Sequence, residues 1–295
     1  MNAALRRAAF LIPVYQDQQN FDDTMRSIAS STVPCSVIAV DDGSEPPLHA
    51  GDYGSAIALH LIRLPHNQGI VAAMNAGLEF AIQAGYEFVA RIDAGDYVSP
   101  ERLERQIQYM DTHPNCMVVG SDAEFRFETG IYCFTVEPPR NPAALSRAMH
   151  QRAWLLHPSV MYRTVVLSDV GFYTNEYPAA EDYEMFLRIA QRHEVGVVPE
   201  PLIVYIIRRS GISLRRVHMQ AWSRLRIQLH YFAWRNWHSY YGVARTIATL
   251  LLPYAVKISL KSRFVYRRTV QRKTQPSSSS PVPAVVPSTP GRISQ

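Results

Sequence analysis

Short apolar runs alternate with helix-like segments over the first 120 residues of this 295-residue chain. The first run, residues 8–14, is apolar throughout, which is typical of a strand that is covered on both faces. Strands that alternate with helices of this length predict an α/β fold with a doubly wound, mostly parallel sheet. The other predicted strands are residues 35–40, 57–64, 86–92 and 116–120, and the predicted helices cover residues 68–83 and 100–111, the second with Ser99 as N-cap.

Acidic residues follow two of these predicted strands. Asp41 and Asp42 end one strand, and Asp93 and Asp96 end another. In an open α/β sheet, ligands bind at the carboxyl ends of the strands. The competing interpretation is that Asp, Gly and Ser form turns here for local reasons. Two such clusters at equivalent strand ends favour a ligand site.

A third acidic pair, Glu181 and Asp182, begins a helix that the pattern predicts over residues 181–192. Acids in a first helical turn also stabilise the helix dipole, by about 0.3–1 kcal/mol, and that alternative suffices for this pair alone. The presence of two other acidic clusters favours a functional role for this pair as well. Residues 121–180, between the last of the predicted strands and this acidic pair, have a less regular pattern, in which three prolines interrupt the periodicity.

Six stretches of the chain occur in an order and at intervals that resemble the family 2 inverting glycosyltransferases, over about residues 8–215. They are IPVYQ, VDDGS, NQGIVAAMNAGL, ARIDAGDYVSPERLERQ, LLHPSVMYRTVVLSDVGFY and AEDYEMFLRIA. The resemblance implies a GT-A fold, a nucleotide-sugar donor and a divalent cation, Mg²⁺ or Mn²⁺.

The resemblance also implies a donor-binding set. In the family, the acids of the VDDGS stretch face the base and ribose of the donor, and the IPVYQ backbone lines the same base pocket. An Arg often found before the helix asparagine is Met74 in this chain. Ser213 and the two arginines before it match a segment that lines the diphosphate. The implied set is Pro13, Tyr15, Asp41, Asp42, Asn67, Gly69, Asn75, Asp93, Arg208 and Arg209.

The implied cation site departs from the family pattern. The family run resembles Asp-Ala-Asp-Asp, in which the third residue is a common metal ligand, whereas this chain has Gly95 there. Asp93 and Asp96 match the outer positions and are the predicted ligands. Hard cations prefer such carboxylate oxygens. We expect the cation to stabilise the leaving diphosphate, and Gly95 to allow a tight backbone turn.

An inverting enzyme needs a base that removes the proton of the acceptor hydroxyl. By resemblance this base is Asp182, and Glu181 is its neighbour and a candidate acceptor ligand. His157 has two interpretations, contact with acceptor or metal and a structural role before Pro158.

Charge is distributed unevenly along the chain. Residues 1–200 hold 14 Lys/Arg and all 25 Asp/Glu, whereas residues 201–295 hold 16 Lys/Arg and no acid. Helical patterns at residues 217–241 and 243–273 combine these basic residues with aromatic ones, which predicts amphipathic helices at an anionic membrane surface. The alternative is that these helices pack on the catalytic domain.

No membrane-spanning helix is expected in this basic region. The uncharged run at residues 246–256 would extend only about 16 Å as a helix, against a hydrocarbon layer of about 30 Å. Arginines with interleaved aromatics also suit nucleic acid. We predict no nucleic-acid partner, because the body is acidic and carries no recognised nucleic-acid module.

These patterns predict three regions. They are a GT-A nucleotide-sugar-binding and catalytic domain at 1–215, a basic aromatic-rich helical region at 216–274, and a Pro/Ser tail at 275–295. Three widely spaced cysteines indicate a reducing compartment, and we expect a cytoplasmic protein at the inner face of the cell membrane.

The predicted reaction moves a sugar from a nucleotide diphosphate donor, UDP being expected, to a glycan or lipid-linked acceptor for cell-surface polysaccharide synthesis. One alternative is a nucleotidyltransferase, for which no Gly-rich nucleotide loop is evident. The other is a nucleotide-sugar-binding scaffold that Gly95 has deprived of its metal.

Overall fold

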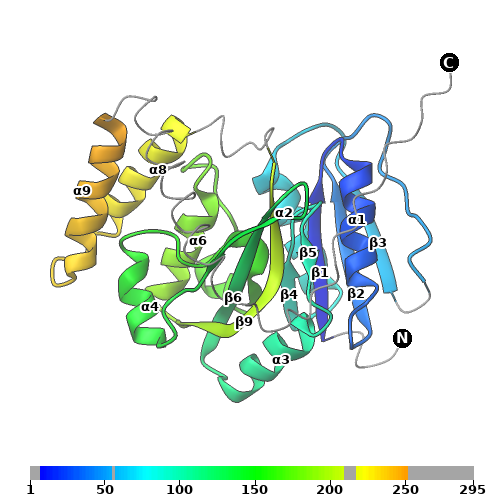
Figure 1. Cartoon of the computed structure of the whole chain (residues 1–295), viewed down its shortest axis with the longest axis horizontal. Helices are drawn as coiled ribbons and strands as arrows, with labels where there is room; N and C mark the ends of the chain where they lie inside the picture. The colour runs from blue at the N-terminus through cyan, green and yellow to red at the C-terminus, as the bar shows by residue number, and fades with distance from the viewer. Residues whose placement is uncertain (1–6, 55–56, 209–216, 252–295) are drawn as a thin grey trace.

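The computed structural model describes residues 7–54, 57–208 and 217–251 (Figure 1). Its strands form one sheet in the order β3-β2-β1-β4-β8-β6-β9-β5, with β7 paired to β6. The strands are β1 Ala8–Val14, β2 Cys35–Asp41, β3 Ile57–Arg63, β4 Phe88–Arg91, β5 Tyr97–Val98, β6 Cys116–Phe127, β7 Tyr132–Val136, β8 Met161–Arg163 and β9 Glu194–Ile207.

Parallel pairing dominates this sheet. The pairs β1–β2, β2–β3, β1–β4 and β6–β9 are parallel and contain most of the paired residues. The short strand β8 lies antiparallel between β4 and β6. The predicted α/β fold with a mostly parallel sheet is therefore confirmed.

Helices cover the sheet. Figure 1 shows α8 and α9 at one end of the molecule, beside α4 and α6, and β3 near the other end. The helices are α1 Gln18–Ile28, α2 Ile70–Gln83, α3 Arg102–Thr112, α4 Pro142–Met149, α5 Val166–Val170, α6 Glu181–Ala190, α8 Val217–His230 and α9 Trp237–Leu251, with a short 3₁₀ helix at His157–Ser159.

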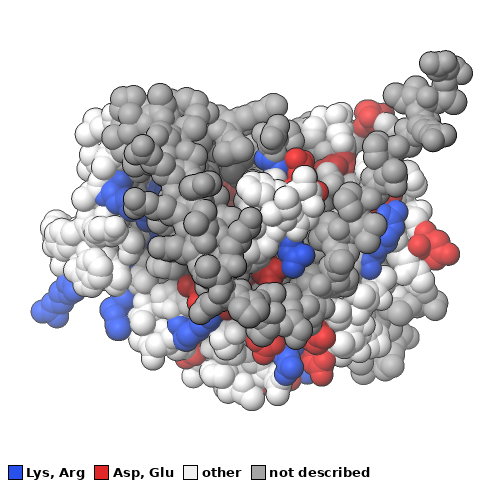
Figure 2. All heavy atoms as spheres, in the orientation of Figure 1, with Lys and Arg blue, Asp and Glu red and all other residues white. Residues whose placement is uncertain are grey.

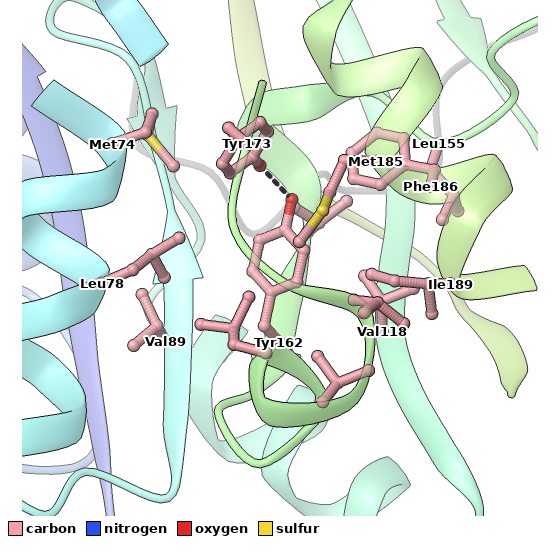
Figure 3. Packing of buried hydrophobic residues seen from close by; sticks show 14 of the residues in the cluster. Met74, Leu78, Val89, Val118, Leu155, Tyr162, Tyr173, Met185, Phe186 and Ile189 are labelled. Carbon is pink, nitrogen blue, oxygen red and sulfur yellow. Dashed lines mark hydrogen bonds between the residues drawn. The ribbon is translucent and has the colours of Figure 1, made fainter. Parts of the chain in front are cut away.

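Alternate residues of β1 enter two different cores. Leu11 packs in the core that contains α2 and α6, whereas Phe10 and Ile12 pack in the core that contains α1 and α3. Strand residues point alternately to opposite faces, so this fully apolar strand is covered on both. In the first core, the Tyr162 and Tyr173 hydroxyls hydrogen-bond at 2.5 Å among apolar side chains of α2 and α6 (Figure 3).

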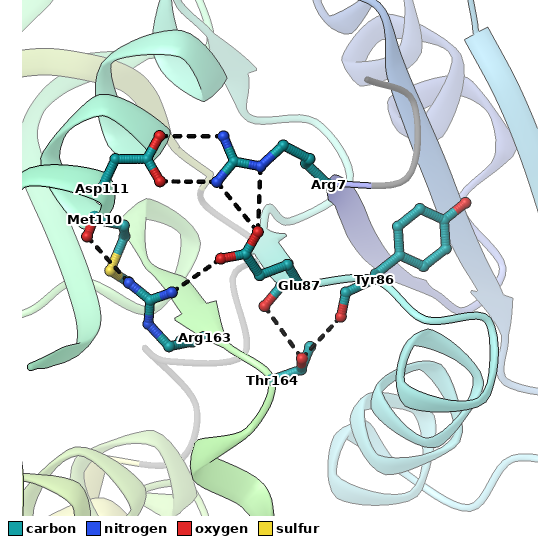
Figure 4. A network of polar contacts seen from close by, with 7 residues as sticks. All are labelled: Arg7, Tyr86, Glu87, Met110, Asp111, Arg163 and Thr164. Atoms are coloured by element: carbon teal, nitrogen blue, oxygen red, sulfur yellow. Dashed lines mark hydrogen bonds and ion pairs between the residues drawn. The ribbon is translucent and has the colours of Figure 1, made fainter. Parts of the chain in front are cut away.

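A polar network joins the amino-terminal ends of the central strands (Figure 4). Arg7, just before β1, donates to Glu87, just before β4, and to Asp111 of α3. Arg163 of β8 also pairs with Glu87, at 3.0 Å. These groups are partly exposed, so each pair contributes about 0–1 kcal/mol. The network marks the end of the sheet opposite to the predicted acidic clusters.

Several predicted boundaries were wrong. Ser99 does not cap a helix with its side chain, because α3 begins at Arg102 and the Ser99 hydroxyl donates to Glu101 instead. The segment 121–180 is more regular than predicted, with a β6–β7 hairpin and with α4 capped by Asn141.

The two C-terminal helices also differ from the predicted ranges. The chain turns at residues 231–236, where the Asn236 side chain accepts from the His238 N–H at 3.2 Å and α9 begins at once. Asn is a favoured residue at this position, because its side chain satisfies an N–H group of the first turn. The predicted tail at 275–295 and most of the second predicted helix lie outside the described residues.

Candidate functional site

The carboxyl ends of three neighbouring parallel strands meet at one edge of the sheet. Asp42 continues from β2, and its N–H donates to Val14 O of β1 at 2.8 Å. Ile92 continues from β4, and its N–H donates to Leu11 O at 3.2 Å. The exposed side chain of Tyr15 follows β1, whereas Pro13 lies within that strand, paired with Val40. The strand pairing thus gathers the residues predicted for the base pocket.

Asp41 and Asp42 organise the loops of this edge. The Asp41 carboxylate accepts from the N–H groups of Ser44 and Leu48 at 2.8 and 3.0 Å. Asp42 accepts from Gln68 and Gly69 at 2.7 and 2.9 Å, directly before α2. Each carboxylate oxygen can accept a further hydrogen bond, so these contacts are compatible with binding of the nucleotide-sugar donor by the two carboxylates.

The residues predicted from the α2 segment have different environments. Asn67 is exposed in the loop before α2. The Asn75 amide instead bonds both main-chain groups of Tyr173, at 3.0 and 3.1 Å. Met74, where the family often has Arg, is buried in the core. Asn75 therefore holds the segment of Tyr173 in place.

The turn from Asp93 to Asp96 is held by α1. The Thr24 hydroxyl accepts from the Gly95 N–H at 2.7 Å and donates to Asp96 O at 2.8 Å. Asp96 is 1% exposed; its Oδ1 accepts from Ile206 N–H at 2.9 Å, and its Oδ2 has no partner among the described residues. Burial, and then the charge of Asp93, raise the pKa of Asp96 to about 8.

Arg91 connects this turn with the predicted base. Its side chain is nearly fully buried and forms an ion pair with Asp93. Burial raises the pKa of Asp96, Glu181 and Asp182, and the positive charge of Arg91 opposes this rise at all three. The two acidic pairs therefore share the field of one buried cation. Nε and Nη1 of Arg91 have no hydrogen-bond partner among the described residues.

Glu181 and Asp182 form the first turn of α6. Asp182 is partly exposed, and its Oδ1 accepts from the Tyr183 N–H at 2.8 Å. The charge of Arg224, from α8, also lowers the pKa of Asp182 against the effect of burial. The Ser223 hydroxyl donates to Pro178 O at 2.7 Å and ties α8 to the segment before α6. Helix α8 thus belongs to the surroundings of the predicted base, which sequence reasoning missed.

His157 has a buried structural environment. Its Nε2 lies 2.8 Å from the Tyr173 hydroxyl. Burial, followed by the charge of Arg91, holds the pKa of His157 well below its ordinary value. A neutral, buried histidine that bonds a core tyrosine favours the structural interpretation over contact with the acceptor.

Arg208 lies over the turn at Gly95. Its Nη2 donates to Gly95 O at 2.5 Å, and its contacts with Ala94 O and Asn20 Oδ1 are both 3.4 Å long. Gly95 has φ +86°, and a Cβ built on it would overlap the Arg208 guanidinium. The predicted residues Arg209 and Ser213 lie outside the described residues.

The cation site has two carboxylates available. Among the described residues, no group of three or more His, Cys, Asp or Glu side chains is arranged to hold a metal ion. Asp93 and Asp96 are joined by a turn in which Asp96 N–H donates to Asp93 O at 3.1 Å. A divalent cation that takes its remaining ligands from substrate phosphates needs only one or two carboxylates. The unpartnered Oδ2 of Asp96 fits such an ion.

A second notable surface lies on α8, α9 and the turn between them. Seven large side chains there are at least half exposed: Trp222, Leu229, Trp234, Trp237, Tyr240, Tyr241 and Leu251. Phe232 packs edge-on against two of the rings at 4.9 Å. Residues 217–251 contain no acid, and over these helices Figure 2 shows blue side chains without red ones. In the part of the chain that the structure describes, no helix has the length and apolar character of a membrane span.

Comparison with known proteins decides the family. A model described as Glycosyl transferase family 2 matches residues 9–157, half of the chain. The chain belongs to glycosyl transferase family 2. The match covers the acid-bearing ends of β2 and β4 and reaches His157, so the predicted resemblance is confirmed.

Relatives and solved structures agree with this assignment. The chain is 29% identical over 204 residues to the amylovoran biosynthesis glycosyltransferase AmsE of Erwinia amylovora, covering 65% of this chain and 73% of AmsE. The structure of S. aureus TarS 1–349 in complex with UDP-GlcNAc matches with a TM-score of 0.62 at 19% identity, covering 82% of this chain and 71% of that one.

A further match is the mannosyltransferase PcManGT of Pyrobaculum calidifontis in complex with GDP-Man and Mn²⁺. It has a TM-score of 0.54 at 15% identity and covers 91% of this chain and 83% of PcManGT. Similarity at these identities concerns the fold, and it confirms the predicted GT-A-like architecture of this family 2 glycosyltransferase.

Proposed function

We propose that this family 2 enzyme is an inverting glycosyltransferase that moves a sugar from a nucleotide diphosphate donor, UDP-linked, to a glycan or lipid-linked acceptor in cell-surface polysaccharide synthesis. The observation that carries the proposal is the family 2 match over the parallel strands that bring Asp42 and Asp93 to the same end of the sheet. Buried Arg91 supports it, because it pairs with Asp93 and its charge also lowers the pKa of Glu181 and Asp182. A donor diphosphate at the turn and an acceptor at the base would then lie on two sides of one transferred sugar.

The donor nucleotide lies, in this proposal, along the edge formed by β1, β2 and the loop before α2. Asp41 and Asp42 accept hydrogen bonds from the base or ribose with the lone pairs that the backbone N–H groups leave free. Pro13, Tyr15 and Asn67 complete the base side, and Arg208 with Arg209 completes the diphosphate side. Gly69 and Asn75 shape the loop and helix behind them.

Inversion follows from a single displacement. The acceptor hydroxyl oxygen attacks the anomeric carbon on the side opposite to the diphosphate, and Asp182 takes the hydroxyl proton as the new C–O bond forms. The bond from the anomeric carbon to the diphosphate oxygen breaks, and its electron pair leaves with the diphosphate. Glu181 orients the acceptor. General-base assistance of this kind typically accelerates a reaction by about 10²–10⁴.

A divalent cation is part of this proposal. Asp96, with Asp93 beside it, would hold Mg²⁺ or Mn²⁺, which when bound supplies Lewis-acid stabilisation of the leaving diphosphate. We expect EDTA to abolish transfer and added Mn²⁺ to restore it. Undiminished transfer in chelator would reject this part of the proposal while leaving the enzyme class intact.

We propose that the surface of α8 and α9 contacts an anionic membrane from the cytoplasmic side. Exposed Trp and Tyr side chains with arginines and no acids suit the headgroup region of such a membrane. The full chain should sediment with anionic phosphatidylglycerol vesicles and much less with neutral vesicles, and Trp234→Ser with Trp237→Ser should weaken this binding. Binding to RNA but not to vesicles would contradict the membrane partner.

The reaction itself is tested by product analysis. The enzyme is incubated with UDP- and GDP-sugars, Mn²⁺ and candidate glycan or polyprenyl-linked acceptors, and released nucleoside diphosphate and new glycoside are measured. NMR of the glycoside should show an anomeric configuration opposite to that of the donor. Release of inorganic pyrophosphate from an NTP would instead indicate a nucleotidyltransferase. Donor binding without any turnover would indicate a scaffold.

A further inference from the structure

The Arg208 guanidinium occupies the space that a side chain at position 95 would fill. An acidic side chain at position 95, as in the family run, would begin with a Cβ that overlaps the Arg208 guanidinium and lies 2.9 Å from Cγ of Asn20. The absence of a side chain at Gly95 thus leaves room for a guanidinium. A cationic group therefore stands where the family run that this segment resembles has an acid.

The fold brings these two residues together. Strand β5 pairs antiparallel with β9, and Tyr97 lies opposite Val204. Continuing this register back from Tyr97 and forward from Val204 brings Arg208 beside the turn at residues 93–95. Asp96 strengthens the connection by accepting from the Ile206 N–H at 2.9 Å. The meeting of guanidinium and turn is therefore a consequence of strand pairing.

The guanidinium is held without being neutralised. Its contacts are to the main-chain oxygens of Ala94 and Gly95 and to the Asn20 amide oxygen. Among the described residues, Arg208 forms no ion pair, although its charge lowers the pKa of nearby Asp96 against the effect of burial. An arginine that is oriented by carbonyl groups but has no carboxylate partner retains its charge for a ligand.

We infer that Arg208, already assigned to the diphosphate side, holds the β-phosphate without a bridging cation and so supplies the contact that the family's third acid makes through a metal ion. The inference rests on the proposed function, because it assigns a phosphate ligand to the same site. A carboxylate at position 95 attracts phosphate only through a bridging cation, whereas a guanidinium pairs with phosphate oxygens by two parallel N–H bonds. Nucleoside diphosphate binding by this chain therefore persists without metal, even though transfer requires it.

Binding calorimetry with UDP, GDP and the corresponding monophosphates, in Mn²⁺ and in EDTA, tests the inference. The diphosphate that binds in Mn²⁺ should also bind in EDTA. In EDTA, Arg208→Ala should weaken the binding of that diphosphate by about 10- to 150-fold, which is the range expected for the loss of charge-assisted hydrogen bonds. The affinity for the monophosphate, which lacks the β-phosphate, should fall by less than about 2-fold. Arg208→Lys should retain part of the affinity.

Two further variants sharpen the result. Gly95→Asp displaces the guanidinium and restores an acid, so its diphosphate binding should be lost in EDTA and retained in Mn²⁺. Arg105→Ala, which removes an exposed arginine of α3, is the matched control and should leave diphosphate binding unchanged both in EDTA and in Mn²⁺. Thermal unfolding checks that each variant is folded, and Arg208→Ala alone suffices if the positive φ of Gly95 makes the Asp variant unstable.

Two results would overturn the inference while leaving the proposed function intact. One is complete loss of wild-type diphosphate binding in EDTA, and the other is equal weakening of monophosphate and diphosphate by Arg208→Ala. Absence of binding by both UDP and GDP in Mn²⁺ and in EDTA would contradict the proposed function itself, and the inference with it.

Discussion

Replacing Asp42 by Asn tests the structural role of this carboxylate in holding the loop before α2. Asp42 is 4% exposed and accepts from two backbone N–H groups, those of Gln68 and Gly69, at 2.7 and 2.9 Å. An Asn side chain keeps one acceptor oxygen and turns an NH₂ group toward the other N–H. One charge-assisted hydrogen bond is lost, which costs about 1.5–3 kcal/mol. For a chain of this size that corresponds to a decrease in melting temperature of roughly 3–12 °C.

Urea and thermal unfolding measure this cost, and hydrogen exchange locates it. Protection should fall in the segment around Gln68 and Gly69 and remain unchanged in α3. Glu45→Gln is the control, because its carboxylate is largely exposed and its pair with Arg63 contributes about 0–1 kcal/mol. If Asp42→Asn unfolded at the wild-type urea concentration with unchanged exchange, these two bonds would not be what holds the loop, and the reasoning would fail.

Three other predictions concern the same site. Asp182→Asn should lower kcat by about 10²–10⁴ while donor binding, measured by calorimetry, stays intact; near-normal turnover would remove Asp182 from the role of base. Because burial raises the pKa of Asp182 and a base must be ionised to accept a proton, kcat/KM should fall with decreasing pH at a higher pH than an ordinary aspartate would give. Asn75→Ala should reduce the free energy of unfolding by about 1–3 kcal/mol through its two lost bonds to Tyr173 and leave UDP affinity unchanged, whereas a selective loss of affinity would favour direct nucleotide contact.

The strands and the acids at their ends were predictable because the governing interactions are local. The run at residues 8–14 is apolar at every position, and β1 is indeed covered on both faces. Asp42 and Asp93 follow strands that pair in parallel with β1, so their meeting at one edge of the sheet follows from the α/β pattern alone. Helix α6 begins at Glu181, as its acidic first turn indicates.

Other features depend on contacts between distant segments, which periodicity does not encode. Ser99 is a residue type favoured at N-caps, but its hydroxyl donates to the Glu101 carboxylate, and α3 begins later than the pattern predicts. The strand β8, which lies antiparallel between β4 and β6, has only three residues, too few to give a recognisable strand pattern in the sequence. Arg224 approaches Asp182 only because α8 packs beside α6, and a basic amphipathic pattern alone fits solvent or membrane equally well.

Arg91 illustrates why charge counts along a sequence do not describe a site. The first 200 residues carry a clear excess of acid, and nothing in the ARIDAGD stretch distinguishes Arg91 from a surface arginine. In the fold this arginine is 3% exposed and pairs with Asp93, and its charge lowers the pKa of Asp96, Glu181 and Asp182 against the effect of burial. Burying a cation is costly unless acids surround it, and burying those acids is costly unless a cation is near. Arg91 and the acids whose pKa it lowers therefore make one another's burial less costly, and this links the turn after β4 electrostatically with the first turn of α6.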